Sequence, residues 1–489
     1  MYRQPSKRKV ILQRTAVYAL MSIAVAALVT VLILIMLGYQ FNRADGRIEQ
    51  GGLVQFESRP TGASVSIDGT AYGSQTNTKA TLAAGGHFIK MERDGYKPWQ
   101  KSVNVIPGSV LWLNYARLIP AELKPTHVAE FSTVTSSAVS PDNKWMMIKD
   151  DPATAVLHLA DLTGDKVALT ELRLPAQSFT PPSAGKTQRF TIEKWDEDSR
   201  FVLVRHVRDD TKTEWLVVDT RDAANTKNVT ALLGINAKKI MFSTNNGQLL
   251  YALTDANDVR KIDLGQATLS GPLVTNVADF SLYDTSVIAY TSLIDPTAKI
   301  RTVGYLDEGA KQPRVLRSYT DDGALPLHIR IGKYFDDMYA AIAYGDTIDI
   351  LVGKLPRDDE TSLMKLEGTM TLQGGIEYLA TRTNGRFIVA QAGSTFSVYD
   401  MELKKMSSTS VPGTAAVTRE LDWIDNYMPW SDRDGKLRFY EFDGANQHEI
   451  MPVVPGQSVT LSQNGKYVYG ISKQDDGKTH LSRVQLILN

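Results

Sequence analysis

Residues 197–220, EDSRFVLVRHVRDDTKTEWLVVDT, contain the repeating unit that decides the fold of most of this chain. A turn leads into the apolar strand FVLVRHV, a polar loop follows, and a second strand, EWLVVDT, returns. Short runs rich in Val, Phe and Trp, bounded by turn residues, are typical of β-strands paired in a hairpin. We therefore interpret the segment as a hairpin within a β-sheet.

Seven further segments share this order of turn, strand, polar loop and strand. Aligned on their turn residues, the eight copies are 38 to 56 residues apart, with a mean of 46. A four-stranded propeller blade takes ~40–50 residues, so the period predicts one blade per copy. The copies lie at residues 140–164, 197–220, 244–265, 283–309, 335–355, 382–403, 424–444 and 462–488, and their turn residues are Asp142, Asp198, Asn246, Asp284, Asp336, Asn384, Asn426 and Asn464.

A β-propeller over residues 125–489 follows from this period, because a single blade cannot bury both faces of its sheet. Each hairpin would form the middle of a blade, with weaker strands such as residues 128–139 completing it. Eight blades are favoured; seven blades, with one hairpin inserted within a blade, and two separate β-domains are the alternatives. The SPDNK (140–144) and TNGRF (383–387) cores resemble repeats of the Tol-associated periplasmic propeller and of WD-repeat-like families.

Residues 51–120 precede the repeats and alternate short apolar runs with Gly, Pro, Asn and Asp. In ASVSIDG (63–69) the apolar side chains share one face of a strand, and the final Asp-Gly supplies a hairpin turn. Further strands are expected after residues 85–87 and over residues 110–118. The pattern predicts a small β-sandwich.

This segment of about 70 residues resembles the PEGA domain, a small β-sandwich module. Thr61 replaces the Glu of the family's name, and the usual Thr-Pro after the first hairpin is absent. The resemblance implies an extracytoplasmic bacterial module, often fused to other domains, that binds the cell surface or its polymers; it implies no enzyme. The matching elements are Pro60-Thr61-Gly62-Ala63, Val65-x-Ile67-Asp68-Gly69, Gly85-Gly86-His87, Gly95-Tyr96 and Leu118-x-Pro120.

Residues 17–37, VYALMSIAVAALVTVLILIML, carry no charged side chain. As an α-helix they span ~30 Å, the thickness of a bilayer's hydrocarbon core. A cleaved signal peptide has an apolar core of ~7–15 residues followed by small residues, whereas this run ends in the bulky MLGYQF (36–41). We predict a transmembrane helix over 17–39 rather than a signal peptide or a buried core helix.

Charge is unevenly distributed, although the whole chain is neutral. Residues 1–47 hold seven of the 54 basic residues and one of the 54 acidic residues, which leaves about −6 for the rest. Five of the seven precede the apolar run, so the positive-inside rule predicts a cytoplasmic N-terminus. With only 16 residues before the anchor, we expect no cytoplasmic output domain, which argues against a sensor.

The search for chemistry is mostly negative. The chain has no cysteine, which excludes disulfides, thiol catalysis, Cys-ligated zinc and a lipidated cysteine. No nucleophile elbow, P-loop or dinucleotide fingerprint occurs, and the mildly acidic body predicts no nucleic-acid partner. The seven histidines lie singly, without ligand spacing, and are His87, His127, His158, His206, His328, His448 and His480.

Two further patterns are interpreted as structural. Asp432-x-Asp434-Gly435 resembles part of a calcium loop, but no acidic ligands follow at the required positions, so a hairpin turn is favoured. Tryptophans at strand spacing usually lie in the core, although each could stack on a sugar. They are Trp99, Trp112, Trp195, Trp215, Trp423 and Trp430.

These observations predict an all-β protein with one N-terminal transmembrane helix, acting as a non-enzymatic binding or scaffold protein of the bacterial cell envelope. We expect a protein or polysaccharide partner at the propeller loops, and no catalytic, cofactor or metal residue is assigned. The alternative is a propeller enzyme that acts on cell-surface glycans through carboxylates gathered at the channel mouth. The expected domains are a cytoplasmic N-terminus (1–16), a transmembrane helix (17–39), a tether (40–50), the sandwich (51–120) and the propeller (125–489).

Overall fold

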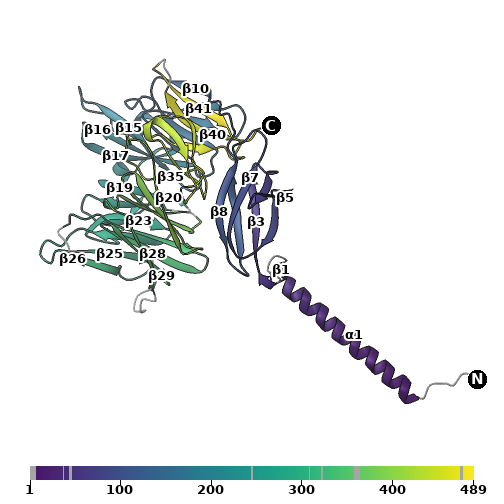
Figure 1. The fold of residues 1–489 in the computed structure, drawn as a ribbon. Coiled ribbons are helices and arrows are strands. Elements are labelled where there is room, and N and C mark those ends of the chain that lie inside the picture. Colours follow the sequence, from purple (N-terminus) through teal and green to yellow (C-terminus); the bar gives the residue numbers. More distant parts are fainter. Residues whose placement is uncertain are drawn as a thin grey trace, which may run out of the picture. The chain divides into compact units, whose positions relative to one another are not determined.

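The computed structural model describes residues 7–36, 38–42, 47–243, 246–307, 309–320, 323–356, 364–382, 384–473 and 477–488. The chain divides into two compact units, residues 1–122 and residues 123–488 (Figure 1). Parts of several features predicted above lie outside the described residues, namely residues 1–6, 37, 43–46, 244–245, 308, 321–322, 357–363, 383, 474–476 and 489.

The first unit begins with the helix α1 (Lys7–Met36), whose segment Ile11–Met36 is long and apolar enough to cross a membrane. None of the side chains in its most apolar window is buried against other parts of the protein. The hydroxyl groups of Thr15 and Thr30 donate to the carbonyl oxygens of Ile11 and Ala26, at 3.0 and 2.9 Å. These two polar groups are therefore satisfied without water, as a lipid environment requires.

A short hairpin and a β-sandwich complete the first unit. The hairpin consists of β1 (Tyr39–Asn42) and β2 (Arg47–Gln50). The sandwich has a three-stranded sheet in the order β6-β3-β9 and a four-stranded sheet in the order β5-β4-β7-β8. Its strands are β3 (Gly52–Arg59), β4 (Ser64–Ile67), β5 (Thr70–Gln75), β6 (Thr78–Leu82), β7 (Gly85–Glu92), β8 (Trp99–Val105) and β9 (Val110–Arg117).

The core of the sandwich lies between the two sheets and confirms the predicted alternation. Val65 of β4 is 2% exposed and packs with Phe56 of β3 and Trp99 of β8. Asp68 and Gly69 both have positive φ, 51° and 80°, and join β4 to β5 in a two-residue turn. The twist of such a turn matches the twist of the strands that it connects.

The second unit contains eight four-stranded antiparallel sheets within the described part of the chain, and this confirms the predicted propeller. We number the sheets as blades 1 to 8 in chain order. Blade 1 consists of β11 (Ser136–Val139), β12 (Trp145–Lys149), β13 (Val156–Asp161) and β14 (Ala168–Arg173), and blade 2 of β15 (Gln188–Trp195), β16 (Phe201–Arg208), β17 (Lys212–Asp219) and β18 (Lys227–Asn228). Blade 3 consists of β19 (Ala237–Ser243), β20 (Asn246–Thr254), β21 (Val259–Asp263) and β22 (Thr268–Leu269), and blade 4 of β23 (Val277–Tyr283), β24 (Val287–Ser292), β25 (Ile300–Asp307) and β26 (Arg314–Thr320).

The remaining blades follow the same plan, with one exception in blade 8. Its outer strand, β10 (Thr126–Phe131), comes from the beginning of the unit, whereas its other strands come from the end. A short helix, α2 (Val229–Leu233), links blades 2 and 3. Blade 5 contains β27 (Leu327–Tyr334), β28 (Asp337–Tyr344), β29 (Thr347–Gly353) and β30 (Lys365–Thr371), and blade 6 contains β31 (Tyr378–Thr381), β32 (Phe387–Ala392), β33 (Thr395–Asp400) and β34 (Lys405–Ser410). Blade 7 contains β35 (Asp422–Trp423), β36 (Pro429–Ser431), β37 (Lys436–Phe439) and β38 (His448–Pro452), and blade 8 contains β39 (Val459–Leu461), β40 (Tyr467–Lys473) and β41 (Thr479–Gln485) with β10.

Apolar side chains pack successive blades face to face. Between blades 1 and 2, for example, Met147 and Leu159 meet Val202 and Leu216. Between blades 7 and 8 the sheets approach so closely that a Cβ on Gly470 would lie 2.9 Å from Cε of Met451. Glycine at this position therefore allows the two sheets to pack.

The ring closes where blade 8 meets blade 1. β10 pairs antiparallel with β41, from Thr126 opposite Arg483 to Phe131 opposite Thr479. In Figure 1 the blue β10 lies beside the yellow β41. Residues 128–139, predicted as one weak strand region, thus contribute β10 to blade 8 and β11 to blade 1.

We expect the closure to be essential for stability, because Phe131 of β10 is buried with Tyr469, Ile471 and Leu481 in the core shared by blades 8 and 1. Phe131→Ala should destabilise the propeller by about 3–5 kcal/mol through lost burial and an unfilled cavity. Denaturant unfolding of the detergent-solubilised protein, followed by tryptophan fluorescence, measures this change. Leu169→Ala, on the exposed outer strand β14, is the control and should stay within about 0.5 kcal/mol. Equal effects of the two substitutions would contradict the closure.

Candidate functional site

The first strands of the blades surround a central channel. Glu420, two residues before β35 of blade 7, interacts electrostatically with Lys194 of blade 2 and Arg330 of blade 5. These blades are not neighbours in the ring, so their first strands must face a common space. The outer strands, by contrast, are largely exposed, as β14 and β30 show.

Each of blades 2 to 7 contributes at least one charged side chain from its first strand or from a residue next to that strand. We call this set the channel ring. Its four basic and three acidic groups nearly balance, which favours a polar ligand over a strongly charged one. The channel ring consists of Lys194, Lys239, Asp279, Arg330, Arg382, Glu420 and Asp422.

β-Bulges occur in the first strands of blades 2, 3 and 4, just before their channel-ring residues. The strand register shifts before Lys194, Lys239 and Asp279. A bulge bends a strand and re-aims the side chains that follow it. Nζ of Lys239 lies 2.7 Å from a carboxylate oxygen of Asp279, so the re-aimed side chains of blades 3 and 4 meet.

Glu420 is the carboxyl group of the channel ring with unused hydrogen-bonding capacity. Its side chain is exposed and, in the described part of the chain, makes no hydrogen bond or ion pair. The protein around the channel reduces the hydration of the carboxylate and so raises the pKa of Glu420; the neighbouring Asp422 raises it further, whereas Arg330 opposes the shift. A carboxyl group with a raised pKa and free oxygens can accept hydrogen bonds from a ligand or donate a proton to it.

Arg382 follows β31 and contains a buried donor. Its Cζ lies 4.9 Å from the centre of the Trp423 ring, and its Nε is buried without a hydrogen-bond partner among the described residues. Burial lowers the pKa of Arg382, and the acidic groups of Asp422 and Glu420 oppose this. The Arg382 guanidinium is therefore held in place by Trp423 and by charge.

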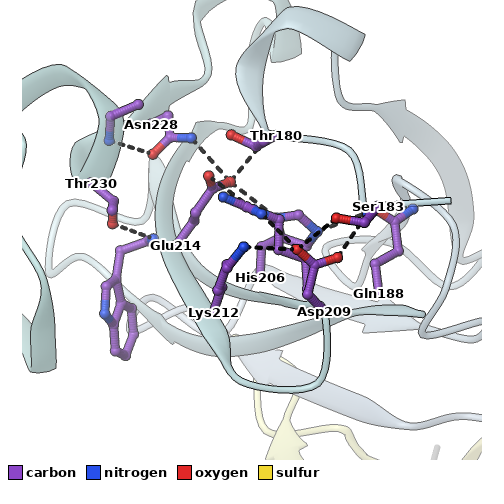
Figure 2. A network of polar contacts seen from close by, with 12 residues as sticks. Thr180, Ser183, Gln188, His206, Asp209, Lys212, Glu214, Asn228 and Thr230 are labelled. Carbon is purple, nitrogen blue, oxygen red and sulfur yellow. Dashed lines mark hydrogen bonds and ion pairs between the residues drawn. The ribbon is translucent and has the colours of Figure 1, made fainter. Parts of the chain in front are cut away.

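A second polar cluster, in blade 2, differs because its groups are saturated (Figure 2). An oxygen of the Glu214 carboxylate accepts from the backbone N–H of Thr180 at 3.0 Å and from the side chain of Asn228 at 3.3 Å. It also lies 3.2 Å from Nδ1 of the fully buried His206, whose ring stacks on Phe190. We call these residues, with Asp209, the blade 2 network.

Asp209 anchors the same loop from the β16–β17 turn. The backbone N–H of Ser183 donates to it at 2.7 Å, and Lys212 lies 3.2 Å away. The Ser183 hydrogen bond, followed by the Lys212 and Ser183 side chains, lowers the pKa of Asp209 to about 2. The blade 2 network thus fastens the loop between β14 and β15 to the blade, and this is a structural role.

The histidines noted in the sequence analysis lie in different surroundings. His206 is buried in the blade 2 network, and Nε2 of His328 donates to the carbonyl of Ile376 at 3.0 Å. His127 of β10 and His480 of β41 come together, with ring centroids 4.8 Å apart. Because 353 residues separate these two histidines in the chain, spacing gave no sign of their proximity. Among the described residues, no group of three or more His, Asp or Glu side chains is placed to hold a metal ion.

Asp432 and Asp434 both accept hydrogen bonds from backbone N–H groups. Asp432 accepts from the N–H of Gly456 at 2.7 Å, and Asp434 accepts from the N–H of Thr414 at 2.8 Å. Of the six tryptophans considered, five are buried and Trp112 of the sandwich is 42% exposed.

The channel ring was missed by sequence reasoning, because each of its members is a single charge in a separate blade. A signal was nevertheless present. From Lys194 through Lys239, Asp279, Arg330 and Arg382 to Asp422, successive charges are 40 to 52 residues apart, which matches the period of the blades.

The blade 2 network should make stability depend on pH. Burial lowers the pKa of His206 below its ordinary 6.5, and the contact with Glu214 opposes this only in part. The unfolded chain therefore binds a proton more readily, and stability should fall as the pH drops below 6.5. His206→Gln should flatten this fall between pH 7.5 and about 5, measured as thermal midpoint against pH by calorimetry.

His87→Gln is the opposite-sign control. Burial alone would lower the pKa of His87, but hydrogen bonds with Asp68 and with the carbonyl of Ala83 raise it overall. The stability that protonated His87 contributes is present below pH 6.5 and is lost as the pH rises through the pKa of His87 in the folded protein. The acid-side fall should thus persist in this variant, and its disappearance would contradict the assignment to His206.

Comparison with known proteins gives one family match. Residues 52–118 match the model of the PEGA domain. A search of curated protein sequences finds no match to the chain.

Solved structures with a similar chain path include three propeller-sized proteins. An oligogalacturonate lyase in complex with manganese has a TM-score of 0.41 and 14% identity over 75% of this chain and 98% of its own. The Cps50 (Swd1) β-propeller domain of Myceliophteria thermophila has a TM-score of 0.39 and 10% identity over 75% of this chain and 100% of its own. Sqt1 of Saccharomyces cerevisiae has a TM-score of 0.44 and 10% identity over 75% of this chain and 98% of its own. The match over residues 52–118 and the eight sheets together identify a chain that carries a PEGA domain followed by a β-propeller.

Proposed function

We propose that the chain is a single-pass, membrane-anchored binding protein of the bacterial cell envelope, whose propeller recognises a polysaccharide or a protein. α1 would be the anchor, with its basic end in the cytoplasm and both β-rich units outside the membrane. Two observations support this placement: α1 is apolar, and PEGA domains usually lie outside the cytoplasm.

The observation that carries the proposal is the convergence of charged side chains from six blades on one channel. The Glu420 carboxylate is exposed there and makes no hydrogen bond or ion pair with the described residues, whereas the carboxylates of the blade 2 network are used within the protein. A polar ligand in the channel would donate hydrogen bonds to Glu420 in place of water.

A second function, glycan cleavage, is favoured by one specific feature. Glu420, with its raised pKa, lies close to Asp422, Arg330 and Arg382. A carboxylic acid of raised pKa beside a second carboxylate is an arrangement suited to general acid catalysis. Binding without turnover remains our proposal, and turnover is its direct competitor.

Membrane placement is tested by adding protease to intact cells or protoplasts. The anchor model expects loss of the chain beyond residue 50 and retention of α1 in the membrane fraction. Complete protection of the body would reverse the proposed orientation. Release of the intact body into the medium would show that α1 is removed as a signal peptide.

Ligand binding is tested with a glycan array and with proximity labelling from the propeller. Glu420→Gln should weaken binding of the ligand found in this way about 10- to 100-fold, the value of a hydrogen bond to a charged group. Glu171→Gln is the matched control, because Glu171 lies on the exposed outer strand β14 and pairs with Arg173 at 2.6 Å. Equal binding by both variants would remove the channel from the proposal.

Turnover is assayed on the same glycans. New reducing ends that accumulate with the wild-type protein, but not with Glu420→Gln, would establish the enzymatic alternative. Retention of the glycan without cleavage across the pH range supports the binding role.

A further inference from the structure

One end of the β-sandwich is joined to the end of α1 by backbone hydrogen bonds. The N–H of Gly38 donates to the carbonyl of Ile35 in α1, and the carbonyl of Gly38 accepts from the N–H of Gly51, at 3.0 and 2.9 Å. The carbonyl of Gly51 in turn accepts from the N–H of Gly108, also at 2.9 Å. The loop before β9 is therefore two hydrogen bonds away from Gly38, which lies two residues after the end of α1.

Glycines permit this close attachment. Gly38 has a φ of 81°, and a Cβ there would lie 3.1 Å from the carbonyl oxygen of Gly51. A Cβ on Gly52 would lie 2.6 Å from Cγ1 of Val105. Because Gly38 and Gly51 are bonded to each other, the residues between them add no length between α1 and the sandwich.

The end of the sandwich next to α1 is uncharged, and we call it the helix-proximal end. Strand pairing brings its segments together, with Gly52 opposite Leu82 and Gly85 opposite Val105. It consists of the segments GGLV (51–54), LAAGG (82–86) and VIPGSVLWL (105–113). Charged side chains begin at its margin, where Asp68 and His87 pair at 2.7 Å.

The opposite end of the same sandwich is charged. The strands β3, β7 and β9 end there, and the loop from β7 to β8 lies there as well. Its charged residues are Arg59, Glu92, Arg93, Asp94, Lys97 and Arg117. This contrast indicates that the two ends of one small module face different surroundings.

Large apolar side chains are exposed at the helix-proximal end. Ile106 is 52%, Val110 is 45% and Trp112 is 42% exposed. Ile48 of β2, three residues before Gly51, is 64% exposed. Single apolar residues are common on protein surfaces, whereas a contiguous group of them marks an interaction or membrane-contact site.

The position of Trp112 matches the thickness of the interfacial layer of a bilayer. Val110 and Trp112 are two residues apart on β9, so they share one face of the sheet and lie ~7 Å apart along the strand. Each polar layer of a bilayer is roughly 5–8 Å thick. Tryptophan is enriched in this layer because its ring is apolar and its N–H is polar. With Ile106 and Val110 at the inner boundary of the layer, Trp112 would lie among the headgroups.

We propose that the helix-proximal end of the sandwich lies in the interfacial layer of the membrane, with Ile106, Val110 and Trp112 in contact with lipid. The inference rests on the anchor role proposed above for α1, and it names lipid as the partner of this surface. Because α1 holds the surface next to the bilayer, the contact forms at a high effective concentration. A second copy of the chain, or another protein, on the same surface is the competing outcome.

Bromolipid quenching of the full-length protein in vesicles tests the inference. The probe is phosphatidylcholine brominated near the headgroup end of an acyl chain, which quenches tryptophans that touch lipid. α1 contains no tryptophan, and Trp112 is one of seven in the chain. Emission should therefore be lower in brominated than in unbrominated vesicles by up to about one-seventh. Trp112→Phe should remove this difference.

Ile106→Asp tests the surface while leaving Trp112 in place, and Leu325→Asp is its matched control. Both positions are exposed and lie in loops, Ile106 before β9 and Leu325 before β27 of the second unit. A carboxylate is unfavourable at the acyl boundary, so Ile106→Asp should reduce the quenching at least about 2-fold. Leu325→Asp should leave it unchanged, and both variants should keep a nearly unchanged thermal midpoint because the substituted side chains are exposed.

Three outcomes would overturn the inference. They are the absence of bromolipid quenching in the wild-type protein, equal quenching of wild type and Trp112→Phe, and equal quenching of Ile106→Asp and Leu325→Asp. Protection of Trp112 from acrylamide without bromolipid quenching would assign the surface to a protein instead.

Alkaline carbonate extraction of the same vesicles separates this inference from the proposed anchor. If the chain stays in the membrane fraction but Trp112 is not quenched, the lipid contact fails and the anchor stands. If carbonate releases the chain, the anchor fails as well.

Discussion

The antiparallel pairing of β10 with β41 holds the ends of the propeller together, and the packing of blade 8 against blade 1 depends on it. Each blade is covered on both faces only when it has two neighbours, because its middle strands are apolar on both sides. Without this pairing, blades 8 and 1 would expose the surfaces that Tyr469, Ile471, Met146 and Ile148 now bury. The hydrogen bonds from Thr126–Phe131 to residues 479–483 convert a row of sheets into a closed ring.

Closure of the ring also creates the channel and decides which side chains share it. Lys194 and Glu420 are 226 residues apart in the chain, yet they interact because their blades face the same space. The contrast with blade 2 separates scaffold from candidate site. His206, Asp209 and Glu214 form hydrogen bonds within the protein, whereas the exposed Glu420 forms none with the described part of the chain.

The blades were predictable from the sequence where burial imposes a pattern. Middle strands such as β16, with FVLV at residues 201–204, are buried on both faces and must be apolar, so their hairpins recur visibly. Outer strands such as β14 are largely exposed and carry no such requirement. The assignment of β10 to blade 8 was not predictable, because β10 is adjacent in the chain to β11 of blade 1.

Closure has a consequence for the time course of synthesis. Phe131 and Thr479, which meet in the closing pair, are separated by 348 residues. At a synthesis rate of ~5–20 residues per second, the interval between their emergence is roughly 20 to 70 seconds. Throughout that interval one face of blade 1, including Met146 and Ile148, has no covering sheet. The nascent chain must therefore be shielded from aggregation until its last strand arrives.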